Sequence, residues 1–235
     1  VALARDLGVP GPVVVRFGST SSADGRPVEF HQDGDTLVGP SDSDGAQTVL
    51  AHVEDLHRSL PHDRSNALAA AAAALGGGAT LDGVRAALKE FGGLAHRVEL
   101  VGAAAGVRWF DDSKATAPHA TLAALRGFDS VVLVAGGRNK GLDLSALHDG
   151  VEHVRAVVGI GESGAEVLAA FPDRPGVLAQ SMSEAVLAAA DLATPGDVVL
   201  LSPGCASFDW YASYSERGDD FAHHVRSLVL NGAAS

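Results

Sequence analysis

Two compact apolar runs constrain the fold of this chain more than any other feature. "VVLVA" covers residues 131–135, and "VVLLS" covers residues 198–202. Neither run alternates between apolar and polar residues, which is the pattern of parallel strands buried on both faces. Helical stretches separate these two runs from further short strands, namely "GVRWFDD", "AVVGIG" and "GVLAQS". This alternation predicts an α/β domain with a Rossmann-like, doubly wound, mostly parallel sheet over residues 95–235.

The first 94 residues follow a different pattern. Short β-rich runs between Gly, Asp and Ser turns over residues 11–39 predict a meander of antiparallel strands. The alanine-rich stretch "SNALAAAAAALGGG" predicts a helix that ends at its glycines. Thr80 is a candidate N-cap for a second helix, which places four apolar residues on one face: Leu81, Val84, Leu88 and Phe91. We therefore expect residues 1–94 to form part of a domain that is distinct from residues 95–235.

Composition excludes several classes of function and site. The formal net charge of −12 disfavours non-specific binding to nucleic acid or to anionic membranes. No run approaches the roughly 18 apolar residues of a membrane span. Cys205 is the only cysteine, so the chain forms no disulfide within itself, and a reducing cytoplasm is the expected location. The chain begins at Val1 without a methionine, which we interpret as the start of a piece of a longer protein.

Polar residues follow three of the predicted strands at the point where each strand ends. The three stretches are "WFDDSKAT", "VVLVAGGRNKG" and "VVLLSPGCASFD". Ligands of an open α/β sheet gather at the carboxyl ends of its strands. Lys114, Lys140, Ser202 and Ser207 would meet there, together with free amides of a final helix that we expect to begin at about Ser207. Each residue also has a structural interpretation as a cap or a solvated side chain, but their convergence predicts a pocket for a carboxylate or a phosphate.

Two other motifs are weaker. Gly159, Gly161 and Gly164 in "GIGESG" have the G-x-G-x-x-G spacing of a dinucleotide-binding loop. That loop belongs after the first strand of a βαβ unit, and this is the third candidate strand, so we favour a role in turning and packing. The ten histidines have no zinc-like spacing, and the side chains of His223 and His224 diverge on a helix. We predict no metal ligands.

An ordered series of motifs resembles the Mur ligase family, and within it the ligases that add D-glutamate to UDP-N-acetylmuramoyl-L-alanine. The series consists of "PHDRSNALAAAAA", "GLAHRVE", "GVRWFDDSKATAPHAT", "VVLVAGGRNKG" and "VVLLSPGCASFDWYASYSERGDDF". The resemblance covers essentially the whole chain as the later half of such an enzyme. It implies that residues 1–94 are the last part of the central ATPase domain and that residues 95–235 are the C-terminal domain.

The resemblance also implies a reaction and the residues that serve it. ATP would phosphorylate a carboxylate, and the amine of D-glutamate would attack the acyl phosphate in the synthesis of a cytoplasmic peptidoglycan precursor. The residues implied for nucleotide binding are Asn66, Arg97, Asp112 and Lys114, of which Lys114 also approaches the reacting centre as the catalytic cation. Those implied for binding D-glutamate are Thr116, Lys140, Ser207 and Tyr214. The sequence departs from the usual family residues at Asp63, Ala117, Pro118, Arg138 and Tyr214.

The sequence contains no G-x-x-x-x-G-K-[ST] phosphate loop. The resemblance places that loop and the magnesium ligands upstream of Val1, so ATP and Mg are expected cofactors of a larger enzyme. We expect this polypeptide by itself to be inactive. Two alternatives remain open at this point: a non-catalytic module that binds an amino acid or a nucleotide, and a nicotinamide-dependent oxidoreductase suggested only by "GIGESG".

Overall fold

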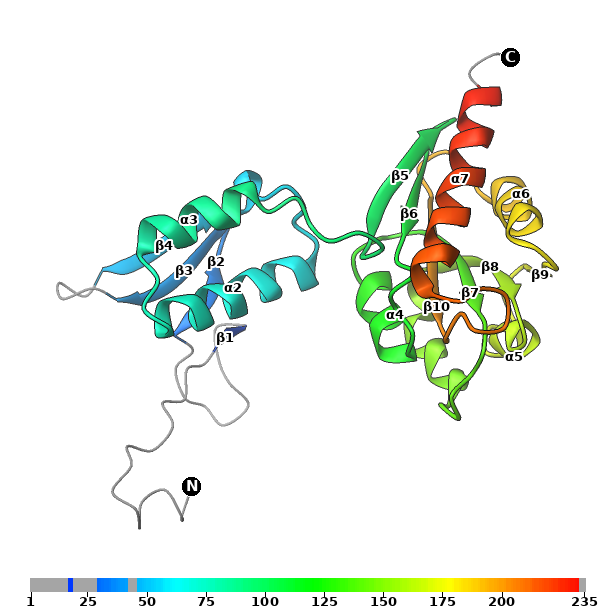
Figure 1. Ribbon diagram of the computed structural model, residues 1–235, viewed down its shortest axis with the longest axis horizontal. Coiled ribbons are helices and arrows are strands. Elements are labelled where there is room, and N and C mark those ends of the chain that lie inside the picture. Colours follow the sequence, from blue (N-terminus) through cyan, green and yellow to red (C-terminus); the bar gives the residue numbers. More distant parts are fainter. Residues whose placement is uncertain (1–16, 19–28, 42–45, 233–235) are drawn as a thin grey trace, which may run out of the picture. The chain divides into compact units, whose positions relative to one another are not determined.

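The computed structural model describes residues 17–18, 29–41 and 46–232 of the chain. These residues fall into two compact units, Val1–Gly92 and Gly93–Ser235 (Figure 1). None of the helices in these described ranges is both long enough and apolar enough to cross a membrane.

The first unit contains a sheet with the strand order β1-β2-β3-β4. The strands are β1 (Phe17–Gly18), β2 (Phe30–Asp33), β3 (Thr36–Ser41) and β4 (Gln47–His52). Strands β2, β3 and β4 form an antiparallel meander, as predicted, whereas β1 pairs with β2 in parallel. The parts of the predicted meander at residues 11–16 and 19–28 lie outside the described residues.

Two helices pack on this sheet through an apolar core. After the short η1 (Val53–Asp55), the helices are α2 (Pro61–Gly76) and α3 (Leu81–Glu90). Thr80 caps α3 as predicted, since its Oγ1 accepts a hydrogen bond of 3.1 Å from the Gly83 amide. Val84 is buried in the core with Leu68 of α2. Phe91 was expected on the same face, but it follows the last residue of α3 and is 60% exposed.

The second unit is built on a six-stranded sheet with the order β5-β6-β10-β7-β8-β9. Its strands are β5 (Glu99–Ala104), β6 (Val107–Asp111), β7 (Val131–Gly136), β8 (Val154–Ile160), β9 (Gly176–Leu178) and β10 (Val198–Gly204). All neighbours pair in parallel except β5 and β6, which are antiparallel. The predicted α/β fold with a mostly parallel sheet is confirmed. The edge strand β5 was not predicted.

Helices bury the sheet of the second unit. They are α4 (Pro118–Leu125), the 3-10 helix η2 (Leu144–His153), α5 (Gly164–Ala169), α6 (Met182–Leu192) and α7 (Tyr214–Gly232). Val132 and Val134 of β7 share a core cluster with Met182 of α6 and Phe221 of α7. Leu133 between them is also fully buried, which explains why "VVLVA" has no polar positions.

The final helix begins later than predicted. Helix α7 begins at Tyr214, not at about Ser207. The carbonyl of Ser207 accepts hydrogen bonds from the amides of Trp210 (3.1 Å) and Tyr211 (2.8 Å). This local turn delays the helix, so the free helix-start amides that we expected beside Ser207 are absent from that position.

Candidate functional site

The carboxyl ends of β6, β10 and β7 lie side by side. Because β10 pairs in parallel with both neighbours, all three strands end at the same edge of the sheet. The loops beyond them are also joined: the Gly204 amide donates to the Ala115 carbonyl (2.9 Å), and Arg138 and Ala206 exchange two backbone hydrogen bonds. The predicted convergence of the three polar stretches is confirmed at the level of the backbone.

Two glycines make this close approach possible. Gly136 and Gly137 have φ values of 126° and 125°, which residues with a side chain rarely adopt. A Cβ on Gly136 would overlap the carbonyl of Ile160, and one on Gly137 would overlap the carbonyl of Ala206. Glycine at the last position of β7 and at the position after it is therefore required by the packing of the strand ends.

The side chains at this edge form two pairs. Lys140 Nζ lies 3.5 Å from Thr116 Oγ1, so the loops after β7 and β6 meet. Lys114 Nζ lies 5.2 Å from the centroid of the Tyr214 ring, a distance at which a cation is attracted to the ring face. A hydrogen bond with Lys114 and its positive charge lower the pKa of Tyr214. Four of the residues implied by the resemblance thus form two contacting pairs at the strand ends.

The serines of the third stretch are less accessible than expected. Ser207 is only 2% exposed. The Ser202 hydroxyl donates a 2.7 Å hydrogen bond to Asp112 Oδ2 inside the unit. Ser202 therefore serves the protein's own carboxylate instead of offering a free hydroxyl to a ligand.

Asp112 is the most deeply buried of the residues implied for nucleotide binding. It is 7% exposed, and desolvation by burial raises its pKa to about 7, against the lowering effects of Ser202, the Val98 amide and the charge of Arg97. Arg97 itself is exposed and also lowers the pKa of Tyr214 through its charge. Asn66 is an exposed residue of α2 in the first unit.

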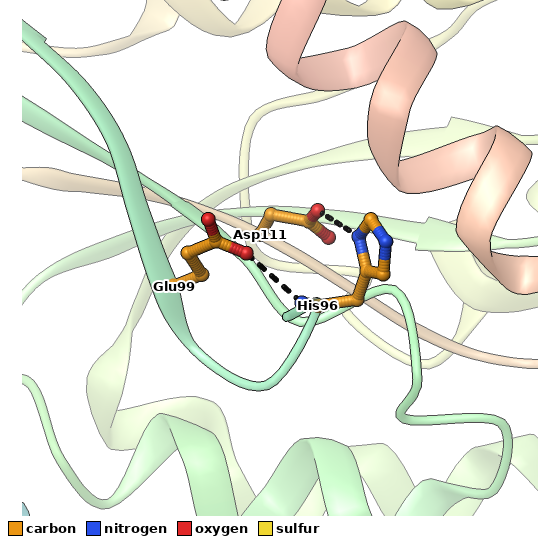
Figure 2. A group of neighbouring side chains, drawn as sticks. All are labelled: His96, Glu99 and Asp111. Carbon is orange, nitrogen blue, oxygen red and sulfur yellow. Dashed lines mark hydrogen bonds and ion pairs between the residues drawn. The ribbon is translucent and has the colours of Figure 1, made fainter. Parts of the chain in front are cut away.

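A group of three titratable residues was missed by the sequence reading. His96, Glu99 and Asp111 have potential metal-ligand atoms within 4.8 Å of one another. Figure 2 shows His96 joined to both carboxylates: its Nδ1 lies 2.7 Å from Asp111 Oδ2, and its backbone amide donates to Glu99 Oε2 at 3.0 Å. Asp111 Oδ1 also accepts from the Ser113 amide at 2.8 Å. The group could hold a cation, but its atoms already satisfy one another, which favours a structural role.

This group depends on the unpredicted strand β5. The antiparallel pairing of β5 and β6 places Glu99 opposite Asp111. His96 and Val98 enter β5 with φ values of 58° and 49°, in the left-handed region that non-glycine residues seldom adopt. The proximity of these three residues could not be predicted from the sequence, because nothing in the sequence indicated a strand that begins at Glu99.

The "GIGESG" loop holds an anion that belongs to the chain itself. The Glu162 amide donates a 2.9 Å hydrogen bond to Asp209 Oδ2, and a Cβ on Gly161 would overlap that carboxylate. A Cβ on Gly159 would overlap the carbonyl of Gly164. The glycines thus serve packing, as favoured above, and the amide of Glu162 is already hydrogen-bonded to Asp209.

Three of the five residues noted above as departures from the family pattern have local structural roles. Asp63 accepts two hydrogen bonds from Arg58 and one from the Leu60 amide at the start of α2. Pro118 occupies the first turn of α4, where its missing N–H has no cost. Arg138 forms a two-fold ion pair with Glu162, with a shortest distance of 2.9 Å.

The buried Asp112 generates a prediction about pH and stability. Its folded-state pKa of about 7 lies above the ordinary value of 3.8, so its contribution to stability is present below 3.8 and is lost as the pH rises to about 7. As the pH rises from 3.8 to about 7, Asp112→Asn should therefore gain stability relative to the wild type, by at most about 4 kcal/mol. Urea unfolding below, within and above the range measures the difference.

Asp143→Asn is the control for this experiment. Hydrogen bonds from Ser145 lower the pKa of Asp143, so its titration lies below 3.8. The difference in free energy of unfolding between Asp143→Asn and the wild type should stay constant over the same pH range. If the difference in free energy of unfolding between Asp112→Asn and the wild type were equally constant, the raised pKa of the buried Asp112 carboxyl would be contradicted.

Comparisons with known proteins show which families and relatives this chain resembles. Residues 96–205 match the model of the "Mur ligase, glutamate ligase domain" family. The UDP-N-acetylmuramoylalanine--D-glutamate ligase of Frankia casuarinae is 45% identical over 233 residues, covering 96% of this chain and 48% of the relative. The chain thus spans about half the length of the curated relatives it matches.

Two solved structures share the fold. MurF from Acinetobacter baumannii has a TM-score of 0.59 at 18% identity, over 84% of this chain and 45% of the other. Mycobacterium tuberculosis folylpolyglutamate synthase, solved with ADP and AMPPCP, has a TM-score of 0.54 at 17% identity, over 86% of this chain and 48% of the other. Residues 96–205, which include the converging strand ends, thus match the Mur ligase family, and the chain is similar to curated D-glutamate ligases over about half of their length.

Proposed function

We propose that this chain is the later half of an ATP-dependent ligase that joins D-glutamate to UDP-N-acetylmuramoyl-L-alanine. The observation that carries the proposal is the meeting of Lys140 and Thr116, 3.5 Å apart on loops from different strands, beside the Lys114–Tyr214 pair. A cation and a hydroxyl at this spacing suit a carboxylate. The name of the Frankia casuarinae relative supports glutamate as the amino acid and UDP-N-acetylmuramoyl-L-alanine as the acceptor.

In this proposal the chain positions reactants and neutralises charge. Lys140 and Thr116 hold a carboxylate of D-glutamate, with Ser207 on the neighbouring loop and Tyr214 near the side chain of the amino acid. Lys114 faces the negative charge that shifts when an acyl phosphate forms and breaks. Preorganised cations and fixed geometry account for much of the rate in reactions of this kind.

The nucleotide is assigned to a second set of residues. Arg97, Asp112 and Lys114 of the second unit form this set, at its start and at the end of β6. Asn66, on α2 of the first unit, is assigned to the nucleotide by the family resemblance alone. The folylpolyglutamate synthase structure with ADP supports a nucleotide in this fold. The phosphate loop and the magnesium ligands are assigned to a part of the enzyme outside these 235 residues, which contain no such loop.

The full enzyme tests the proposal directly. We expect release of ADP only when ATP, UDP-N-acetylmuramoyl-L-alanine and D-glutamate are all present, and none with L-glutamate. The polypeptide of residues 1–235 alone should release no ADP. Release that is indifferent to the amino acid would overturn the assignment of the substrate. Binding of D-glutamate without any turnover by the full enzyme would favour the non-catalytic module.

Lys140→Ala should mainly weaken the use of D-glutamate. Removing one charge-assisted hydrogen bond to a carboxylate costs about 1.5–3 kcal/mol, so the KM for D-glutamate should rise roughly 10- to 100-fold with a small change in kcat. Steady-state kinetics with varied D-glutamate measure this. Arg174→Ala is the control, because this exposed cation precedes β9 and so lies at the opposite edge of the sheet. Unchanged kinetics for Lys140→Ala would remove Lys140 from the site.

Lys114→Ala should depress turnover itself. The charge of Lys114 is expected to matter most as negative charge moves during the reaction, so kcat should fall roughly 100- to 1000-fold. The measurement is kcat at saturating concentrations of all three substrates. An effect confined to the KM for D-glutamate would reassign Lys114 to amino-acid binding.

A further inference from the structure

Arg217 is a buried cation that lies outside every role assigned above. It belongs to the first turn of α7 and is 1% exposed. Its guanidinium donates four hydrogen bonds: Nε to Ser113 Oγ (2.9 Å), Nη2 to the Ser113 carbonyl (2.8 Å), and both Nη atoms to the Cys205 carbonyl (3.2 Å each). One side chain therefore spans the loop after β6 and the end of β10.

The partners of Arg217 lie next to the candidate site residues. Ser113 immediately precedes Lys114, and Cys205 lies two residues before Ser207. The end of β7 also lies close to the Arg217 guanidinium, because a Cβ on Gly137 would lie 3.1 Å from Arg217 Nη1. The guanidinium is thus positioned among all three strand ends.

Ser113 has its polar atoms fully engaged in this arrangement. Its amide donates to Asp111 Oδ1, and its hydroxyl donates to the Tyr214 carbonyl at 2.7 Å while accepting from Arg217. Its carbonyl accepts a further bond from Arg217. The residue before Lys114 is consequently fixed from both sides, by β6 and by α7.

Stability alone is a poor explanation for this arginine. Its hydrogen-bond acceptors are neutral, and among the described residues no carboxylate lies within ion-pair distance of it. Burying a cation is costly, and replacing buried charges with apolar side chains of similar volume is often neutral or stabilising. Burial lowers the pKa of Arg217 to about 10, which still leaves it charged at neutral pH. A planar group with five N–H donors suits the joining of separate backbone segments.

We propose that Arg217 is a positioning residue of the ligase, which holds the loops after β6 and β10 at a fixed spacing so that Lys114 and Ser207 act on the same bound molecule. The inference rests on the proposed function for its substrate and on the hydrogen bonds above for its geometry. It assigns Arg217 no contact with substrate.

The test compares Arg217→Lys with Val225→Ala in the full enzyme. Lysine keeps the charge but offers one nitrogen in place of three, so it cannot reach Ser113 and Cys205 with the same four bonds. Val225 is a fully buried residue of the same helix, and it packs at Gly102 of β5, away from the strand ends. It therefore controls for lost stability in α7.

We expect Arg217→Lys to lower kcat and to raise the KM for D-glutamate together, with kcat/KM reduced roughly 10- to 100-fold, since small misplacements of reactive groups have effects of this size. Val225→Ala should lower the melting temperature and leave both constants near the wild type. Hydrogen exchange should become faster at Lys114–Thr116 and Ala206–Phe208 in Arg217→Lys only.

The outcomes separate this inference from the proposed function. A wild-type enzyme without D-glutamate-dependent turnover refutes the function, and faster exchange at both loops in Arg217→Lys would still support the positioning role. An active wild type with unchanged kinetics and unchanged exchange in Arg217→Lys overturns the inference. Equal kinetic losses in Arg217→Lys and Val225→Ala also overturn it, because the effect would then follow stability alone.

Discussion

The parallel pairing of β10 with β6 and β7 is the constraint on which the candidate site depends. Parallel neighbours end at the same edge, and their ladder hydrogen bonds prevent one strand from sliding against the next. The loops that follow inherit this alignment, which brings Lys140 to Thr116 although they are distant in sequence. Gly136 and Gly137 complete the arrangement, because a side chain at either position would push the strand ends apart.

The sequence predicted the strands that are buried on both faces of the sheet. "VVLVA" and "VVLL" have no polar residues because helices cover both faces of the sheet, so both runs could be predicted as buried parallel strands. The half-exposed edge strand β5 has no such signature: "ELVGAA" mixes Gly and Ala with few β-branched residues. Missing β5 meant missing the His96–Glu99–Asp111 group, since only the β5–β6 pairing brings Glu99 to Asp111.

The remaining errors concern polar residues whose partners lie far away in the sequence. A serine after a strand is equally consistent with a ligand donor and with a buried partner, and only the fold pairs Ser202 with Asp112. The same holds for Arg217, which in the sequence is one charge among several on an amphipathic helix. Its insertion between Ser113 and Cys205 depends on α7 crossing the strand ends.

Asp209 has a consequence for the interpretation of glycine-rich motifs. Its carboxylate accepts a hydrogen bond from the Glu162 amide and fills the space beside Gly161. The next two amides of the "GIGESG" turn, those of Ser163 and Gly164, donate to backbone carbonyls. An external phosphate would have to displace a group that is covalently tethered and always present. Glycine spacing alone is therefore a misleading signal of dinucleotide binding here, and Asp209, from the segment between β10 and α7, is what distinguishes this turn from a cofactor loop.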